Sequence, residues 1–390
     1  MEGKRFLRSI ELKNLLSYGP EGVKLELEPL NVLIGANATG KSNLIQALRL
    51  LQAAPNDLAV PIREGGGIGE WFWKGSTDEA SKRATIECLV FADNKSWPLR
   101  YSLTVTSSSQ ERPEVLSETI DRPLDNEDRL IYYTLPPEGG ASVNSGTGAL
   151  VGMDVVRSKS ILAQINDRLH FPEITLLREA ISQVRFFGDM ALGMSARIPQ
   201  AADLLDDFLF EDGMNLGVIL SDLLNRPSTK SELLQKLGLF YPRVRDLGVR
   251  VRGGTVQVYF HEEGFSAPVP ARRLSDGTLH YLCLLAILLH PEPPPLVCIE
   301  EPELGLHPDA VSAVAELLIE ASKRTQLIVT THSDALVAGL SEVPEAVVVA
   351  ERGDGGTSLR RLEPAKLEKW LEEYRLGDLW RMGELGGNRW

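Results

Sequence analysis

The stretch Asn31-Val-Leu-Ile-Gly35-Ala-Asn-Ala-Thr-Gly40-Lys41-Ser42 decides the fold of this 390-residue chain. It holds a complete G-x-x-x-x-G-K-[ST] element directly after a short apolar run. From Ser42 to Leu51 the apolar residues recur at helical spacing. The order is therefore strand, glycine-rich loop and helix, the setting in which backbone N–H groups at a helix N-terminus bind phosphate oxygens.

This loop predicts a nucleotide site. Lys41 is expected to reach the β and γ phosphates, and Ser42 to supply a hydroxyl to magnesium. A glycine turn that merely precedes a helix is the structural alternative, and the strand and helix on either side disfavour it. We expect contacts with the nucleotide from the loop and the start of the helix, namely Gly35, Asn37, Thr39, Gly40, Lys41, Ser42 and Asn43.

Paired carboxylates follow a second apolar run, Leu296-Val-Cys-Ile-Glu300-Glu301-Pro302. In α/β sheets, ligands bind at the C-terminal ends of the strands. We assign Glu300 to the magnesium ion, and Glu301 to the attacking water, which it would orient or deprotonate. A solvated acidic turn is the alternative, and the phosphate loop elsewhere in the chain disfavours it.

Two further segments gain meaning from these motifs. A third apolar run, Leu327 to Thr331, ends in His332, and Ser275-Asp276-Gly277 precedes a helical pattern. Alone, such a histidine is usually structural, and Ser-Asp-Gly is only a turn and helix cap. Beside strand ends assigned to phosphate and metal, His332 is expected to sense the γ phosphate, because imidazole can donate to a phosphate oxygen.

Together these four elements resemble the ABC ATPase family, as its Walker A loop, its Leu-Ser-Gly-Gly-Gln-type signature, its Walker B strand with a catalytic glutamate, and its switch histidine. The opening Ile10-Glu-Leu-Lys-Asn-Leu-Leu-Ser-Tyr18 and the segment Glu300-Glu-Pro-Glu-Leu-Gly-Leu-His-Pro308 are similar to the RecF/SMC-like branch. That branch includes stand-alone predicted ATPases of bacterial genome-maintenance and phage-defence systems. The resemblance covers both ends of the chain.

The resemblance implies ATP and Mg2+ as cofactors and a homodimer or a higher even-numbered oligomer. In such a head-to-tail pair, Ser275 and Gly277 of one copy would contact the γ phosphate of ATP held by the other. The chain departs from the family at Glu300, where an aspartate is usual, and at Asp276, where a small residue is common. The glutamine of the family's Q-loop is not placed, and Gln110 and Gln183 are candidates.

The expected fold class is α/β, an ABC-type P-loop NTPase head with a mostly parallel sheet, an N-terminal antiparallel β subdomain and a mainly helical insertion. Residues 1–110 would form the Walker A part of the head, and residues 111–264 an inserted lobe, mainly helical with some β structure. Residues 265–390 would carry the signature, Walker B and the switch histidine. The aromatic-rich tail of this last part is either a packed helix or a docking segment, and it comprises Trp370, Tyr374, Trp380 and Trp390.

Composition limits the partners. The formal net charge of −13 argues against coating by nucleic acid through bulk electrostatics, so any DNA contact must be confined to a local face. No signal peptide or membrane span is visible, so no membrane partner is expected. Three cysteines, Cys88, Cys283 and Cys298, cannot all pair, and a reducing cytoplasm is the simplest location.

These observations predict a DNA-linked regulator that is gated by ATP hydrolysis, in antiphage defence or DNA repair. Related ATPases of the overcoming-lysogenization-defect type carry a TOPRIM nuclease after the ATPase core. Only 58 residues follow His332, so a nuclease or other effector is expected to act in trans. The alternatives are a RecF-like recombination mediator without a nuclease partner, a scaffold that ATP stabilises, and a transporter subunit. The long separation of Gly40 and Ser275 disfavours the transporter subunit.

Overall fold

A computed structural model describes residues 2–76, 78, 82–92, 97–124, 128–144, 149–188, 200–201 and 206–387. The chain divides into two compact units. The P-loop unit comprises residues 5–184 and 348–362 together with the residues from 385 onward. The signature unit comprises residues 185–347 and 363–384 together with the short segment before Arg5.

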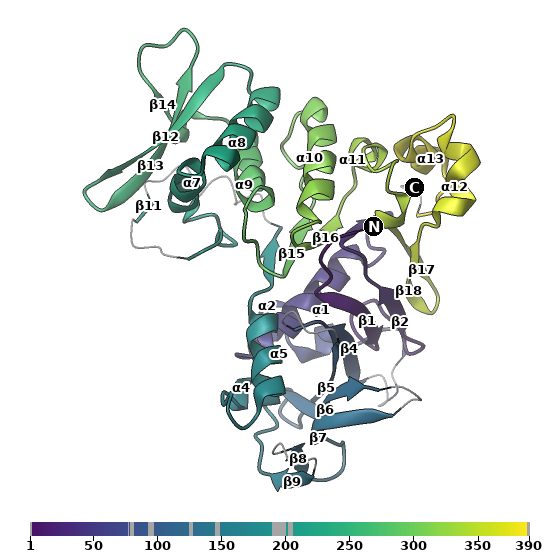
Figure 1. Ribbon diagram of the computed structural model, residues 1–390. Coiled ribbons are helices and arrows are strands. Elements are labelled where there is room, and N and C mark those ends of the chain that lie inside the picture. Colours follow the sequence, from purple (N-terminus) through teal and green to yellow (C-terminus); the bar gives the residue numbers. More distant parts are fainter. Residues whose placement is uncertain are drawn as a thin grey trace. The chain divides into compact units, whose positions relative to one another are not determined.

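An eight-stranded antiparallel sheet forms much of the P-loop unit. Its strand order is β2-β1-β4-β5-β6-β7-β8-β9 (Figure 1). Buried and half-buried residues alternate along β4 and β5, because successive side chains of a strand point to opposite faces. The strands are β1 (Leu7–Lys13), β2 (Val23–Glu26), β4 (Ala84–Val90), β5 (Leu99–Ser107), β6 (Pro113–Pro123), β7 (Arg129–Leu135), β8 (Ala141–Asn144) and β9 (Leu150–Met153).

The expected start of the inserted lobe, residue 111, falls inside this sheet. β5 pairs with β6, and β6 with β7, so strands β6 to β9 continue the N-terminal sheet where a mainly helical lobe was expected. The physical reason lies in β6, where Glu118 and Asp121 are buried. Two buried carboxylates interrupt the apolar alternation by which a strand is recognised in a sequence.

The remainder of the P-loop unit surrounds the glycine-rich loop. All five residues of β3 (Leu30–Ile34) are buried, as expected for an interior strand, and α1 (Lys41–Ala53) follows the loop. β3 neighbours β17 (Val347–Gly353), which pairs with β18 (Gly356–Arg361) in an antiparallel hairpin. The unit also contains short helices, namely α2 (Ala59–Glu64), α3 (Ile68–Trp71), α4 (Ile161–Gln164) and α5 (Pro172–Ser182).

Three parallel strands lie at the centre of the signature unit. Their order is β10 (Arg185–Phe187), β15 (Leu296–Glu300) and β16 (Gln326–Thr330), and Glu300 pairs with Thr330. The C-terminal ends of β15 and β16 therefore meet at one edge. The helices of this unit within the described residues are α7 (Leu216–Leu224), α8 (Pro227–Phe240), α9 (Asp276–Leu288), α10 (Pro308–Ala321), α11 (Asp334–Ala338), α12 (Pro364–Leu371) and α13 (Leu376–Met382), together with the 3-10 turns η4 (Ala271–Arg273) and η5 (Pro344–Ala346).

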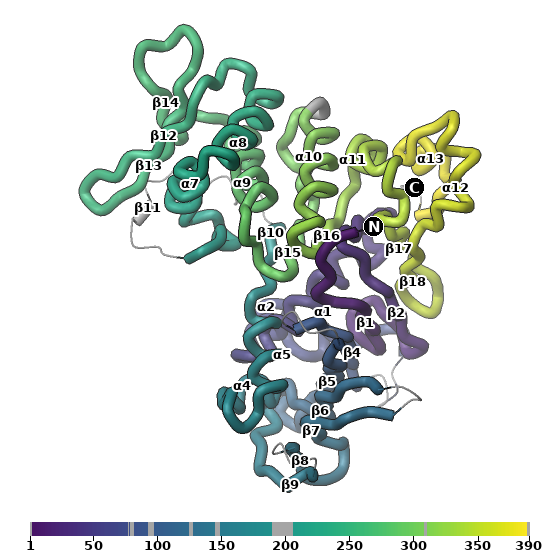
Figure 2. The backbone as a smooth tube through the Cα atoms, viewed as in Figure 1, coloured from purple at the N-terminus to yellow at the C-terminus, as the bar shows by residue number. Residues whose placement is uncertain are grey.

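A second, smaller sheet belongs to the signature unit. The antiparallel hairpin of β12 (Val244–Arg252) and β13 (Thr255–Glu262) is its main part. β11 (Gln200–Ala201) and β14 (Val269–Pro270) both pair with β13. Figure 2 follows the backbone from this hairpin through β14 into α9, which is buried along most of its length.

Among the helices of the described residues, none combines the length and the apolar character that a bilayer crossing requires. The three cysteines are buried free thiols. Burial raises the pKa of Cys283 to about 12. These thiols therefore act as small packing residues.

A buried carboxylate ties β6 of the P-loop unit to the start of α4. Glu118 is 1% exposed, and it accepts hydrogen bonds from the Tyr101 hydroxyl at 2.7 Å, the Ser160 hydroxyl at 2.5 Å and the Ile161 N–H at 2.8 Å. Burial raises the pKa of Glu118 to about 7 in spite of these donors. The free-energy cost of desolvating the charged carboxylate is therefore larger than the stabilisation that the three hydrogen bonds give it.

We predict that Glu118 makes stability depend on pH. Because its pKa rises from 4.5 to about 7 on folding, the contribution is full below about pH 4.5 and is lost as the pH rises through about 7, by about 3 kcal/mol. Glu118→Gln removes this titration. Urea unfolding at about pH 5 and about pH 8 should show that the wild type loses more free energy of unfolding between these pH values than Glu118→Gln does. An equal pH dependence in both would contradict the account.

Candidate functional site

The phosphate loop is held open by backbone conformations that favour glycine. Gly35 has φ 150° and Gly40 has φ 102°, and α1 begins at Lys41 with no side-chain cap at Gly40. The first amides of an uncapped helix lack partners within the helix, so they can donate to phosphate oxygens. A Cβ at Gly35 would lie 2.3 Å from the carbonyl oxygen of Ala350. Gly35 is therefore required by close packing as well as by its conformation.

Lys41 is preorganised by the loop. Its side chain is buried, with 5% exposure for the residue, and Nζ donates to the carbonyl oxygens of Gly35 and Ala36, both at 2.9 Å. Asn37 and Ser42 are exposed, while Asn43 is half-buried. The loop thus offers an ammonium group held at fixed positions beside an accessible hydroxyl, as phosphate and magnesium binding require.

A set of hydroxyl groups that the sequence analysis missed braces this loop. Thr357 on β18 donates from Oγ1 to the Thr39 carbonyl oxygen at 2.8 Å, and its Oγ1 lies 2.7 Å from Ser17 Oγ. The Tyr18 hydroxyl donates to the Gly40 carbonyl oxygen at 3.0 Å, and burial raises the Tyr18 pKa. Tyr18 is the last residue of the opening motif on which the family resemblance partly rests. That motif was the signal in the sequence that could have pointed to this contact.

In the signature unit, Glu301 stands at the end of the acidic strand in a strained conformation. Its φ is 47°, in the left-handed region, which costs on the order of 1 kcal/mol or more for a residue with a side chain. Its N–H donates to the Thr330 carbonyl oxygen at 2.8 Å, which fixes this turn to the end of β16. A Glu301 Oε1 lies 3.7 Å from His332 Nε2, and both side chains are about one-third exposed. The two predicted catalytic groups therefore lie together.

Glu303 positions the histidine, and the sequence analysis overlooked it although it lies within the quoted acidic motif. Its Oε1 accepts from the Thr331 hydroxyl at 2.6 Å and from the His332 N–H at 2.9 Å. Burial raises the pKa of Glu303, and these two donors together with its own backbone N–H limit the rise. Glu303 thereby links the loop after β15 to the residue that carries the imidazole.

The predicted signature residues lie at the N-terminus of α9. Ser275 caps this helix, because its Oγ accepts from the Thr278 N–H at 3.2 Å. Ser275 and Asp276 are exposed, and Gly277 is half-buried. A Cβ at Gly277 would lie 2.2 Å from the Gly305 carbonyl oxygen, so the helix start packs closely on the loop that follows Walker B.

His280 joins the same two segments one turn later. Its Nε2 lies 3.2 Å from the Pro302 carbonyl oxygen, and since a carbonyl only accepts, Nε2 carries the proton. Burial lowers the pKa of His280, which favours the neutral imidazole. The signature helix and the Glu301 turn are thus bonded to each other within one unit.

The predicted metal ligands have the chemistry that magnesium prefers. Ser42 offers a hydroxyl on the first turn of α1, and Glu300 offers a carboxylate at the end of β15, both hard oxygen donors. A Cβ at Gly188 would lie 2.9 Å from Glu300 Oε1, so the absence of a side chain there leaves room for the carboxylate. The longer glutamate in place of aspartate is accommodated in this way.

Neither candidate for the Q-loop glutamine has a position that assigns it that role. Gln110 is exposed in the turn between β5 and β6. Gln183 is exposed at the C-terminal end of α5. Both lie in the P-loop unit, and their role stays a prediction.

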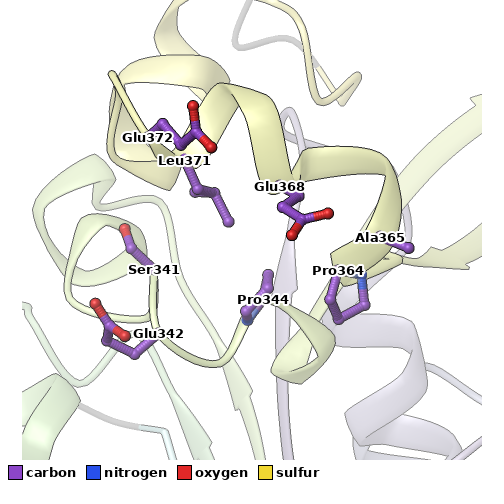
Figure 3. Close-up of a pocket in the computed structure, with 8 residues that line it drawn as sticks. All are labelled: Ser341, Glu342, Pro344, Pro364, Ala365, Glu368, Leu371 and Glu372. Carbon is purple, nitrogen blue, oxygen red and sulfur yellow. The ribbon is translucent and has the colours of Figure 1, made fainter.

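The aromatic tail divides into two parts. In α13, Leu376, Leu379 and Trp380 are buried, so this part is a packed helix. In α12 no residue is buried, and Trp370 is 43% exposed. An open cavity of about 560 Å³ lies beside α12, and none of the predicted site residues line it. Figure 3 shows its lining, which is Ser341, Glu342, Pro344, Pro364, Ala365, Glu368, Leu371 and Glu372. Trp390 lies outside the described residues.

The brace on the phosphate loop yields a prediction. Thr357→Val keeps the side-chain shape but leaves the Thr39 carbonyl without its donor, and a hydrogen bond of about 1 kcal/mol corresponds to about a fivefold loss of ATP affinity. Thr357→Ser retains the hydroxyl and serves as the control. Titration with a fluorescent ATP analogue measures both. Equal affinities for Thr357→Val and the wild type would show that the brace does not shape the site.

Comparisons with known proteins identify a family and two relatives of this chain. The model of the family described as "AAA domain, putative AbiEii toxin, Type IV TA system" matches residues 30–338. The Old nuclease of Escherichia phage P2 is 22% identical over 394 residues, which span 93% of this chain and 62% of that protein. The RecF DNA replication and repair protein of Gloeobacter violaceus is 34% identical over 84 residues, 22% of this chain and 20% of that protein. The chain thus spans less than two thirds of either relative.

Solved structures support the expected fold class. An Smc head domain from Pyrococcus furiosus, bound to the C-terminal domain of ScpA, matches with a TM-score of 0.58 at 16% identity, over 94% of this chain and 99% of that chain. A second Smc head, bound to the C-winged helix domain of ScpA, matches with a TM-score of 0.57 at 17% identity, over 93% of this chain and 99% of that chain. At such identities the likeness concerns the fold alone. The chain belongs to the AAA-domain family that matches residues 30–338, and it is an ABC-type ATPase of the RecF/SMC-like branch.

Proposed function

We propose that this protein hydrolyses ATP with magnesium at composite sites between two copies, and that the cycle gates DNA binding or a partner effector. The observation that carries the proposal is the pair of Glu301 and His332, 3.7 Å apart where two adjacent parallel strands end. A carboxylate beside an imidazole at such a strand edge suits proton transfer from water and donation to a phosphate oxygen.

Each residue has a role in this proposal. Lys41 and the amides at the start of α1 bind the phosphates, and Ser42 and Glu300 would hold magnesium. Magnesium, when bound, neutralises charge on the β and γ phosphates. Glu301 orients the attacking water and accepts its proton, while His332 donates to the γ phosphate. The strained backbone of Glu301 supports this role, since such strain is found where a side chain must be held in one place.

The signature residues act in trans. Ser275 is exposed at the N-terminus of α9, where helix amides and the positive end of the helix dipole favour an anion. Ser275 and Gly277 of one copy would therefore close on the γ phosphate of ATP that is held by the other copy. Gly277 and His280 attach this helix to the Glu301 turn. Closure of the helix on phosphate would therefore change the position of the catalytic carboxylate.

The biological output is antiphage defence or DNA repair. The similarity to a phage Old nuclease and to RecF supports an action linked to DNA, and the partner in trans would be a nuclease, of the TOPRIM class, or another effector. The Smc heads with bound ScpA domains support the idea that such a head carries a partner protein. A cytoplasmic location follows from this role.

Two alternatives remain distinct in their consequences. A RecF-like recombination mediator would bind gapped DNA and need no nuclease partner. The similarity to RecF, which covers a limited segment of the chain, favours this alternative. An ATP-stabilised scaffold would bind ATP tightly without measurable turnover. The strained Glu301 and its neighbouring imidazole favour turnover over a scaffold.

We predict that Glu301→Gln separates binding from hydrolysis. The amide cannot accept the water proton, so turnover should fall by about 100-fold or more, while the phosphate-binding groups are unchanged. With ATP and magnesium, the variant should accumulate a dimer or a higher even-numbered assembly. Light scattering and phosphate release, measured on the same samples, follow both properties.

Lys41→Ala is the matched control, because it should lose ATP binding and stay unassembled with ATP. Full turnover by Glu301→Gln would remove the proposed role of Glu301. If the wild type binds ATP tightly but neither turns it over nor changes its mass, the scaffold is the correct alternative.

A further inference from the structure

The hairpin of β12 and β13 in the signature unit has two different faces. Val249 pairs with Val258 and Val251 with Val256, so one face is apolar. Both strands pack against α7, and β12 also packs against α8 (Figure 1). Val256 and Val258 are buried accordingly. The opposite face is left without a covering helix among the described residues.

This outer face presents arginine and other polar side chains. By register, Arg250 lies opposite Gln257 and Arg252 opposite Thr255, while Gly248 lies opposite Tyr259. The Arg250 guanidinium stands 4.8 Å from the centre of the Tyr259 ring, and the Tyr259 hydroxyl donates to Gln257 Oε1 at 2.6 Å. The tyrosine thereby fixes both neighbours, which lowers the entropy cost of using them to bind a ligand.

The charge of this segment is opposite to that of the chain. Residues 243–273 contain six arginines against three acidic residues, whereas the whole chain has a net charge of −13. Two of the three acidic residues are in ion pairs, Glu263 with Arg245 and Asp246 with Lys230. The third, Glu262, is buried.

Arg250 and Arg252 are exposed, and within the described part of the chain neither has a carboxylate at ion-pair distance. The two are separated by two strand positions, about 6.7 Å, on the same face. They thus form a pair of cations that no acidic group of the described residues neutralises.

We propose that this outer face, formed by Arg250, Arg252, Gln257 and Tyr259, binds the phosphate backbone of duplex DNA. The inference rests on the proposed DNA-linked function and gives it a location. Guanidinium groups bind phosphate oxygens in a bidentate manner, and a flat sheet face with two such groups and an amide fits a repeating phosphate backbone. It is also the local basic face that an acidic chain needs for any contact with DNA.

The position of this face connects it to the nucleotide cycle. β14 pairs with β13 at Tyr259 and Phe260, and the chain runs from Pro270 through η4 to Ser275, the cap of the signature helix. DNA held on the outer face is therefore linked through one short segment to the residues that would close on the γ phosphate. Binding of DNA should consequently affect turnover.

The test compares two double variants of the full-length protein that remove the same charge. Arg250→Ala with Arg252→Ala removes the outer-face cations, while Lys230→Ala with Arg245→Ala removes two cations of the same unit that are ion-paired. Fluorescence anisotropy follows a labelled duplex of about 30 base pairs between about 50 and about 200 mM salt, with ATP and magnesium.

We expect the outer-face variant to bind DNA at least about 10-fold more weakly at the lower salt concentration. The slope of log affinity against log salt should become about 2 less steep, since two phosphate contacts are lost. The control variant should change less than about threefold. Without DNA, both variants should keep the turnover and the thermal midpoint of the wild type, which shows that they are folded.

Equal losses in both variants would overturn the proposal, because bulk charge would then explain binding. Unchanged binding by the outer-face variant would also overturn it while leaving the DNA-linked function intact. If the wild type binds no DNA but binds polyglutamate through these arginines, the face takes an acidic protein. In that case the DNA branch of the function fails as well, whereas the turnover of Glu301→Gln still tests the ATPase cycle separately.

Discussion

The burial of one ammonium group is the constraint on which the P-loop unit depends. Lys41 is almost fully enclosed, and its Nζ donates to the carbonyl oxygens of Gly35 and Ala36, both at 2.9 Å. A buried cation is costly unless it is paired, so the loop must keep a shape that turns these carbonyl oxygens toward the ammonium group. Thr357 and Tyr18 hold that shape from neighbouring segments. The phosphate loop of this chain thus relies on contacts with residues that are far away in the sequence.

The signature unit meets a complementary requirement, which is to hold carboxylates where they repel one another. Glu301 has a left-handed backbone conformation, and the half-buried Glu303 accepts hydrogen bonds from the Thr331 hydroxyl and the His332 N–H. These arrangements lower the stability of the fold. The almost completely buried strands β15 and β16 offset this loss and hold the strained residues in place. The close contact of Gly277 with this loop makes the helix start and the acidic turn one structural piece.

The sequence predicted the motifs well and the context poorly. The strand, loop and helix around Lys41 and the apolar strand before Glu300 follow from local pattern, and the similarity to solved Smc heads confirms the expected fold class. The assignment of catalytic and binding roles stays a prediction. Strand β6 was missed because Glu118 and Asp121 are buried in it, where a pattern expects apolar residues. The Thr357 brace could not be foreseen, since it joins positions more than 300 residues apart.

The central claim is that each ATP site is completed by a second copy, and mixing two inactive variants tests it most directly. Lys41→Ala lacks the phosphate-binding lysine, and Ser275→Arg blocks the signature. In a mixed dimer, one site would combine an intact Lys41 with an intact Ser275 from the other copy. Each mixed dimer would carry one complete site out of two, so an equal mixture should regain turnover, up to about half of the wild-type value, whereas each variant alone stays inactive. If the mixture stays as inactive as its two components, although mixed dimers form, the composite site does not exist.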